Sequence, residues 1–341
     1  MPGQGQLIEP IRWVIVAPTS PFPTSLYPEL PALRTFLLPV ADGHVLQVQE
    51  WGRADGIPAL VLHGGPGSGC SPLLPRFFDP RRFRVICPDQ RGAGRSTPLG
   101  AVTHNSTADL LTDLRTLRVA LGVPHWLVVG GSWGAALALA HALDAPEAVS
   151  GLLLRSTFLA RAADIEDFFR DAPRELAAHW QTLPEAGELE SRNLALAWRA
   201  WEQTMSGLEV TCAPDGPALD VLVRRYRIQS HYLRQGCWLQ QPGLLEQCHR
   251  VPRVPTVLVH GTADRICAPD GARALHASLP HSKLLWAEGA GHDPTHPCMI
   301  QRMVEMLDAF GTRATFESGC RVAQPAGQVA DAAAEAAAEL R

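Results

Sequence analysis

A short glycine-rich segment, Gly130-Gly131-Ser132-Trp133-Gly134, constrains the fold of this chain more than any other feature. It follows an apolar run at residues 126–129 and opens a helical pattern that extends to residue 143. The spacing G-x-S-x-G between a strand and a helix predicts a tight turn, because small residues let the helix pack close to the strand. Such a turn lifts the Ser132 hydroxyl above the sheet edge and points the backbone N–H of Trp133 into the same space. We interpret Ser132 as a candidate nucleophile; the alternative is a glycine-rich turn with an incidental serine.

Short apolar runs recur on both sides of this turn, at residues 59–62, 83–86, 126–129, 151–154, 256–259 and 283–286. Runs of this length suit strands that are buried on both faces of a parallel sheet. Helical patterns, such as residues 106–121 and 133–143, separate several of them, and residues 35–51 alternate as in a β-hairpin. The sequence therefore predicts an α/β fold with a mostly parallel, doubly wound sheet.

The alternation stops between about residues 160 and 250, where the pattern is helical and rich in tryptophan. We predict an inserted helical cap at residues 159–250, over the sheet edge where open α/β folds bind ligands. Residues 34–158 and 251–311 would then form the core. A proline-rich N-terminal extension, residues 1–33, is expected to wrap the surface or to be partly disordered, and residues 312–341 form a low-complexity tail.

A second glycine-rich loop, His63-Gly64-Gly65-Pro66-Gly67, directly follows the apolar run at residues 59–62. Glycines at a strand end let backbone N–H groups approach a ligand closely. The N–H of Gly65 would complete an oxyanion hole with that of Trp133, whereas His63 is interpreted as structural. A phosphate-binding loop is the competing interpretation, but the Gly-Lys-Ser/Thr that it requires does not follow.

A nucleophilic serine needs a base and an acid that orients the base. In the order expected for an elbow serine, the acid comes next and the histidine last. Asp264 lies in a loop after the run at residues 256–259, and His292 lies in a loop after the run at residues 283–286. We predict Asp264 as the acid and His292 as the base, with Asp293 and His296 as the nearest rivals.

A fourth motif, Asp89-Gln-Arg-Gly-Ala-Gly-Arg-Ser96, follows the run at residues 83–86. Its glycines and mixed charges favour a loop that braces the floor of the site over one that contacts substrate.

Composition excludes several other classes of function. The formal net charge is −4 and no long basic run is present, so neither nucleic acid nor an anionic membrane is an expected partner. The eight cysteines contain no C-x-x-C pair, so we predict no metal site, no cofactor and free thiols in a reducing cytoplasm. No apolar stretch reaches the roughly 20 residues that span a bilayer. The sequence leaves the oligomeric state open.

Five motifs together resemble the proline iminopeptidases (prolyl aminopeptidases): H-G-G-P-G, D-Q-R-G-x-G-R-S, G-G-S-W-G, an H-G-x-x-D loop and a final A-G-H. All occur here in that order, and the resemblance covers roughly residues 35–310. It implies the α/β-hydrolase fold and a metal-independent release of N-terminal proline from short peptides or aminoacyl amides.

The resemblance also implies that carboxylates of the cap bind the free amine of the substrate. Trp201-Glu202 matches a Trp-Glu pair of the family, although Glu202 alone reads as a surface charge on an amphipathic helix. A family segment similar to R-I-E-N-H-Y reads Arg-Ile-Gln-Ser-His-Tyr at residues 227–232, so Gln229 stands where glutamate is expected. This departure favours one alternative to a strict aminopeptidase, an esterase or amidase of relaxed specificity. A further alternative is a non-catalytic member of the fold that binds a small ligand, against which the complete set of Ser132, Asp264 and His292 argues.

Overall fold

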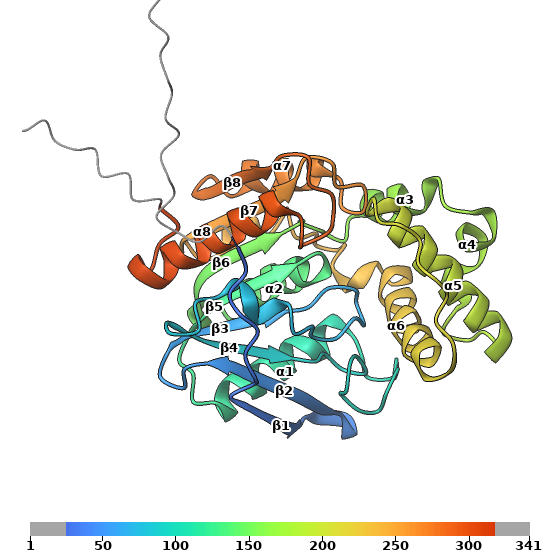
Figure 1. The fold of residues 1–341 in the computed structure, drawn as a ribbon, viewed down its shortest axis with the longest axis horizontal. Coiled ribbons are helices and arrows are strands. Elements are labelled where there is room, and N and C mark those ends of the chain that lie inside the picture. Colours follow the sequence, from blue (N-terminus) through green and yellow to red (C-terminus); the bar gives the residue numbers. More distant parts are fainter. Residues whose placement is uncertain (1–24, 318–341) are drawn as a thin grey trace, which may run out of the picture.

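A single eight-stranded sheet forms the centre of the molecule (Figure 1). The computed structural model describes residues 25–317. The strands are β1 (Arg34–Pro39), β2 (Val45–Gly52), β3 (Ile57–Leu62), β4 (Phe83–Pro88), β5 (Trp126–Gly131), β6 (Val149–Arg155), β7 (Thr256–Gly261) and β8 (Ser282–Ala287). Their order across the sheet is β1-β2-β4-β3-β5-β6-β7-β8. All six apolar runs of the sequence lie within strands.

Pairing within the sheet is mostly parallel. The first two strands form the predicted hairpin, and β2 pairs antiparallel with β4. From β4 to β8 every neighbouring pair is parallel. The predicted fold class is confirmed, and the loops that follow β3, β5, β7 and β8 share one edge of the sheet.

Helices cover both faces of the sheet because side chains alternate between the faces along each strand. On one face the strands pack against α1 (Thr107–Ala120) and α2 (Trp133–Asp144), and the buried residues there include Leu60, Val128, Leu114 and Leu137. On the other they pack against α8 (Pro297–Arg313), and the buried residues include Val61, Val129, Met303 and Phe310. A further helix, α7 (Pro269–Ser278), links β7 to β8.

Four helices stand between β6 and β7 in the chain and lie together beyond one end of the sheet (Figure 1). They are α3 (Ala162–Arg170), α4 (Arg174–His179), α5 (Glu188–Met205) and α6 (Gly216–Arg234), and they fall within the segment predicted as the cap. Aromatic stacking gives this group its own core. Phe169 stacks on Trp180 with ring centroids 4.4 Å apart, and Trp198 stacks on Tyr226 at 4.9 Å.

Both ends of the described chain pack against the α8 side of the core. The Tyr27 hydroxyl donates hydrogen bonds to the carboxylate of Asp308 on α8. Phe316 is buried after α8 ends, so packed structure continues into the segment predicted as a tail. Most of the predicted extension and tail, residues 1–24 and 318–341, lies outside the described residues. Across residues 25–317, no helix combines the length and apolar character needed to cross a membrane.

Candidate active site

The turn between β5 and α2 holds Ser132 in a backbone conformation that non-glycine residues rarely adopt, with φ 58° and ψ −124°. Two glycines make this turn possible. A Cβ at Gly130 would lie 2.1 Å from the carbonyl oxygen of Gly134, and one at Gly134 would lie 2.1 Å from that of Leu62. The helix therefore starts in direct contact with two strand ends, with Ser132 at its tip.

Asp264 and His292 form a hydrogen-bonded pair on the loops after β7 and β8. Nδ1 of His292 lies 2.9 Å from Oδ2 and 3.2 Å from Oδ1 of Asp264. The backbone N–H groups of Ile266 and Cys267 donate to Oδ1 of the same carboxylate. Since an ionised carboxylate only accepts hydrogen bonds, Nδ1 carries the proton and Nε2 of His292 keeps a free lone pair.

Burial acts to raise the pKa of the Asp264 carboxyl, but attraction to His292 and the hydrogen bonds from His292 and the Cys267 N–H outweigh it. The net effect holds the pKa of Asp264 well below its usual range. Asp264 is therefore charged at neutral pH.

A cavity of about 400 Å³ joins this pair to the turn, since Ser132 and His292 both line it. Within the described residues, the Ser132 hydroxyl contacts Sγ of Cys267 at 3.9 Å. No hydrogen bond joins the Ser132 hydroxyl to His292 in this part of the chain. Hydrogen bonds between catalytic groups are often long before substrate binds. The rivals Asp293 and His296 do not line this cavity.

Two backbone contacts fix Cys267 in place. Its N–H donates to Asp264, and its carbonyl oxygen lies 2.9 Å from Nε2 of His260. Burial lowers the pKa of His260, and Nδ1 of that ring accepts a hydrogen bond from the Thr157 N–H. A neutral His260 therefore donates from Nε2 and holds the Cys267 loop under the site.

The loop after β3 lies beside Ser132, and Gly64 and Gly65 both line the cavity. A Cβ at Gly64 would lie 3.4 Å from Cβ of Ser132. Gly65 has φ 114°, a conformation that favours glycine. The N–H of Trp133 begins α2, where the helix supplies no acceptor. His63 is locked in the neutral state, since Nδ1 contacts the Gly64 carbonyl and Nε2 accepts from the Gln90 N–H.

The side-chain amide of Gln90 braces this loop against the turn. Its NH₂ donates to the carbonyl oxygen of His63 at 3.0 Å, and its carbonyl oxygen accepts from the indole N–H of Trp133 at 2.8 Å. Gln90 does not line the cavity. Its contacts support the bracing interpretation of the Asp89–Ser96 motif.

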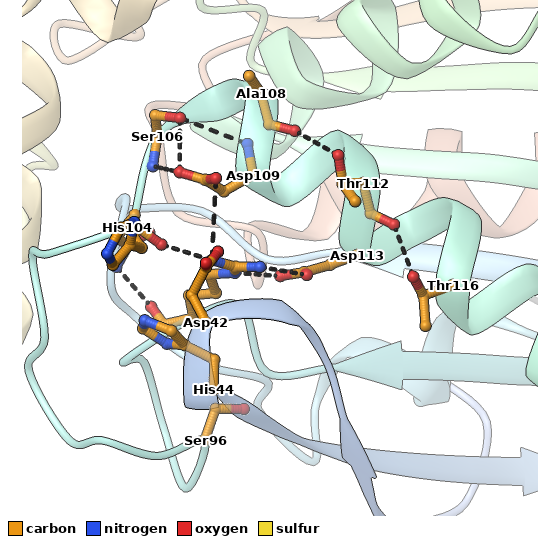
Figure 2. A network of polar contacts seen from close by, with 12 residues as sticks. Asp42, His44, Ser96, His104, Ser106, Ala108, Asp109, Thr112, Asp113 and Thr116 are labelled. Atoms are coloured by element: carbon orange, nitrogen blue, oxygen red, sulfur yellow. Dashed lines mark hydrogen bonds and ion pairs between the residues drawn. The ribbon is translucent and has the colours of Figure 1, made fainter.

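The neighbouring Arg91 is buried in a carboxylate network. It makes a two-pronged ion pair with Asp113, and Asp42 and Asp109 lie 3.4 and 3.9 Å from its guanidinium. Figure 2 shows these three acids converging from α1 and from the turn between β1 and β2. The network fixes the motif to the core.

Helices of the cap supply the far wall of the cavity, which is largely apolar. The lining there includes Ile165, Phe168 and Phe169 on α3 and Leu233 on α6. Two of the predicted substrate residues, Glu202 and Gln229, also line the cavity, and the amide nitrogen of Gln229 lies 3.1 Å from Oε1 of Glu202. The third, Trp201, does not line it; its indole N–H donates to the Phe168 carbonyl inside the cap.

The cavity contains two arginines that the sequence interpretation missed. Arg155, at the end of β6, donates from Nη1 to the backbone carbonyl of His292 at 2.9 Å and so tethers the histidine loop. Arg225, on α6, pairs with Glu202 at 2.7 Å. Neither belongs to a local pattern, because each partner lies on a segment distant in sequence. Across the described residues, no group of three or more His, Cys, Asp or Glu side chains is arranged to hold a metal ion.

Comparison with known proteins places this geometry in a family. Residues 58–295 match the family model described as the alpha/beta hydrolase fold. A proline iminopeptidase of Xylella fastidiosa (strain 9a5c) is 35% identical over 312 residues, covering 84% of this chain and 99% of the relative. A proline iminopeptidase of Arabidopsis thaliana is 33% identical over 305 residues, covering 82% of this chain and 80% of the relative.

Solved structures share the fold at lower identity. VinJ matches with a TM-score of 0.62 at 18% identity, covering 83% of this chain and 99% of that one. A Mycobacterium smegmatis proline iminopeptidase matches with a TM-score of 0.57 at 19% identity, covering 82% of this chain and all (100%) of that one. The resemblance inferred from the five motifs is thus confirmed, and the chain belongs to the proline iminopeptidase family of the α/β-hydrolase fold.

Proposed function

We propose that this chain is a serine hydrolase that releases N-terminal proline, or a similar small residue, from short peptides or amides. The observation that carries the proposal is the hydrogen bond between the buried Asp264 and His292, because His292 lines the same cavity as Ser132. Its relatives in Xylella fastidiosa and Arabidopsis thaliana bear the name of that activity. A cavity of about 400 Å³ suits a small ligand.

The reaction follows from the roles of the three residues. Ser132 Oγ bonds to the acyl carbon while its proton passes to Nε2 of His292, and Asp264 stabilises the imidazolium that forms. The backbone N–H groups of Gly65 and Trp133 stabilise the oxyanion, each worth about 3 kcal/mol in such sites. The amine leaves with the proton from His292, and water then attacks the acyl-enzyme by the reverse sequence.

The direct test is labelling followed by turnover. A fluorophosphonate probe should label the wild-type protein and leave Ser132→Ala unlabelled. Wild type should then hydrolyse proline p-nitroanilide. Absence of labelling in the folded wild-type protein would favour the alternative of a non-catalytic ligand-binding member.

A second candidate, an esterase or amidase of relaxed specificity, is favoured by one observation. Gln229 occupies a place in the cavity wall beside Glu202 and brings no charge there. A panel of acyl esters and N-acylated anilides, tested beside the free-amine anilide, separates the two candidates.

The seven free cysteines of the described residues fit the predicted cytoplasmic location.

A further inference from the structure

The charge of Glu202 is compensated by a side chain of this chain itself. Nη2 of Arg225 lies 2.7 Å from Oε2 of Glu202, and the Tyr226 hydroxyl donates to the same oxygen at 2.9 Å. The guanidinium also lies 5.1 Å from the centre of the Tyr226 ring. Glu202 stands near the end of α5, and its partners stand on the facing side of α6.

Arg225 and Gln229 share that facing side because residues four apart lie one above the other on a helix. Both line the cavity together with Glu202. The segment that carries them packs directly against the loop after β3, since a Cβ at Gly67 would lie 2.6 Å from the carbonyl oxygen of Arg225. The three side chains are therefore next to the acyl-binding region.

Gln229 leaves one acceptor in this group without a partner. Its NH₂ must face Glu202, because the opposite orientation would place two oxygen acceptors against each other. The amide carbonyl Oε1 is then left buried with no hydrogen bond, in a residue that is 7% exposed. Buried acceptors are rarely left unpaired, so a ligand donor is the natural partner for this oxygen.

Charge decides which donor fits. An ammonium group near this oxygen is attracted by Glu202 and repelled by the guanidinium of Arg225, which pairs with Glu202 and lines the same cavity. Because Coulomb energies vary as the inverse of distance, the repulsion offsets part of the attraction. A subsite with one carboxylate, one guanidinium and one amide carries no net charge.

We propose that Arg225 determines the substrate class by neutralising Glu202, so that the subsite accepts an uncharged group at the position of the proline nitrogen. An uncharged secondary amine matches it in both senses: its N–H donates to Oε1 of Gln229 and its lone pair accepts from Arg225. An acyl group with no nitrogen at this position forgoes these two contacts but meets no net charge in the subsite. This inference rests on the proposed hydrolase activity and names its specificity.

The test compares substrates that differ in one ring position. Proline p-nitroanilide and cyclopentanecarboxylic acid p-nitroanilide are measured with wild type, Arg225→Met and Arg225→Lys. Arg224→Met is the matched control, since Arg224 is on the same helix but lies against Gly100 and does not line the cavity. The quantity compared is the ratio of kcat/KM for the proline substrate to that for the cyclopentane substrate.

We expect a ratio below about 10 in wild type, Arg225→Lys and Arg224→Met, and a rise of about tenfold in Arg225→Met, as expected for one charge-assisted contact. The pH profile gives a second measurement. In wild type kcat/KM for the proline substrate should hold or rise as the substrate amine loses its proton, whereas in Arg225→Met it should fall.

A wild-type kcat/KM ratio above about 100 would overturn the inference, since two decades correspond to about 2.7 kcal/mol of amine recognition. An Arg225→Met variant with the same ratio and the same pH profile as wild type would also overturn it. Either result leaves the hydrolase proposal intact. Failure of wild type to cleave either anilide overturns both. If Arg225→Met does not fold, the wild-type ratio and pH profile still decide the question.

Discussion

The sulfur of Cys267 lies 3.9 Å from the hydroxyl oxygen of Ser132. The same residue donates its backbone N–H to Asp264. In the proposed mechanism, a group attached to the sulfur would therefore stand where an acyl carbon approaches Ser132, and it would also disturb Asp264, the acid proposed to orient His292.

We predict partial inhibition by mercurials, relieved in Cys267→Ser. The reaction of the mercurial with Cys267 should be slow, because only a thiolate reacts. Burial, and to a lesser extent the nearby charge of Asp264, raises the pKa of the Cys267 thiol. The measurement is residual anilide hydrolysis against time of exposure. Cys212→Ser serves as control, since Cys212 is exposed and free. Equal inhibition in Cys267→Ser would point to another thiol, with the half-buried Cys298 next in line.

Ser132→Ala should abolish nearly all activity and leave the fold intact. Loss of the nucleophile from such a triad typically lowers turnover by about a million-fold. The measurement is kcat on proline p-nitroanilide, with circular dichroism as the folding control. A purified variant that keeps more than about a tenth of wild-type activity would contradict a role for Ser132 as the nucleophile, because that loss is under 1.4 kcal/mol.

Ser132→Gly should be as inactive as Ser132→Ala but more stable. The positive φ of Ser132 persists in alanine, whereas glycine adopts it without steric strain. Strain of this kind costs about 1–3 kcal/mol, against which glycine loses about 0.5–1 kcal/mol in backbone entropy. We expect Ser132→Gly to gain about 1 kcal/mol over Ser132→Ala in urea unfolding. A less stable glycine variant would show that the turn is not strained.

Gln229→Glu should raise selectivity for a free amine. The change adds a second carboxylate beside Glu202, and charge-assisted hydrogen bonds are worth roughly 1.5–3 kcal/mol against about 1 for neutral ones. We expect the kcat/KM ratio of proline anilide to its N-acetyl form to rise about tenfold. Gln181→Glu, an exposed change in the same cap, should leave the ratio unaltered. Glu202→Gln should lower it. No rise in Gln229→Glu would remove Gln229 from the amine subsite.

Asp308→Asn should stabilise the protein at neutral pH. Burial, opposed by the Tyr27 hydrogen bond and reinforced by the charge of Asp79, raises the pKa of Asp308 from 3.8 to about 6. The folded state thus binds the proton of Asp308 more tightly than the unfolded state does. The stability that this protonation contributes to folding is complete below about pH 4 and is lost as the pH rises through about 6.

Relative to wild type, Asp308→Asn should gain about 1–3 kcal/mol at pH 7.5 and roughly a third of that gain at pH 4.5. Asparagine keeps a carbonyl acceptor for the Tyr27 hydroxyl. The measurement is the difference in urea unfolding free energy between variant and wild type at each pH. An equal difference at both pH values would contradict the assignment.

Local chemistry explains why some of the site is readable from sequence. Gly130 and Gly134 are required by backbone contacts within a few residues, so the turn around Ser132 leaves a short motif. Asp264 and His292 each follow a buried strand, and strand ends of a parallel sheet meet at one edge.

The rest depends on packing between distant segments. The ion pair of Arg225 with Glu202 forms because α5 and α6 lie side by side, and no residue spacing within either helix predicts it. The same holds for Arg155, whose partner is the carbonyl of His292, and for Cys267, whose sulfur contacts the hydroxyl of Ser132. Trp201, adjacent to Glu202, points into the cap because neighbouring helix positions face different directions.

The amide of Gln90 joins the backbone of His63 to the indole of Trp133. The length of this one side chain therefore fixes how far apart the two residues lie. It acts as a spacer between the loop after β3 and the tip of α2. Asparagine would be one methylene too short to span both contacts, and glutamate would present an acceptor to another carbonyl. The Gln90 side chain therefore sets the distance between the loop after β3 and the start of α2. In the proposed mechanism, any movement of one segment relative to the other would change the gap that receives the acyl oxygen.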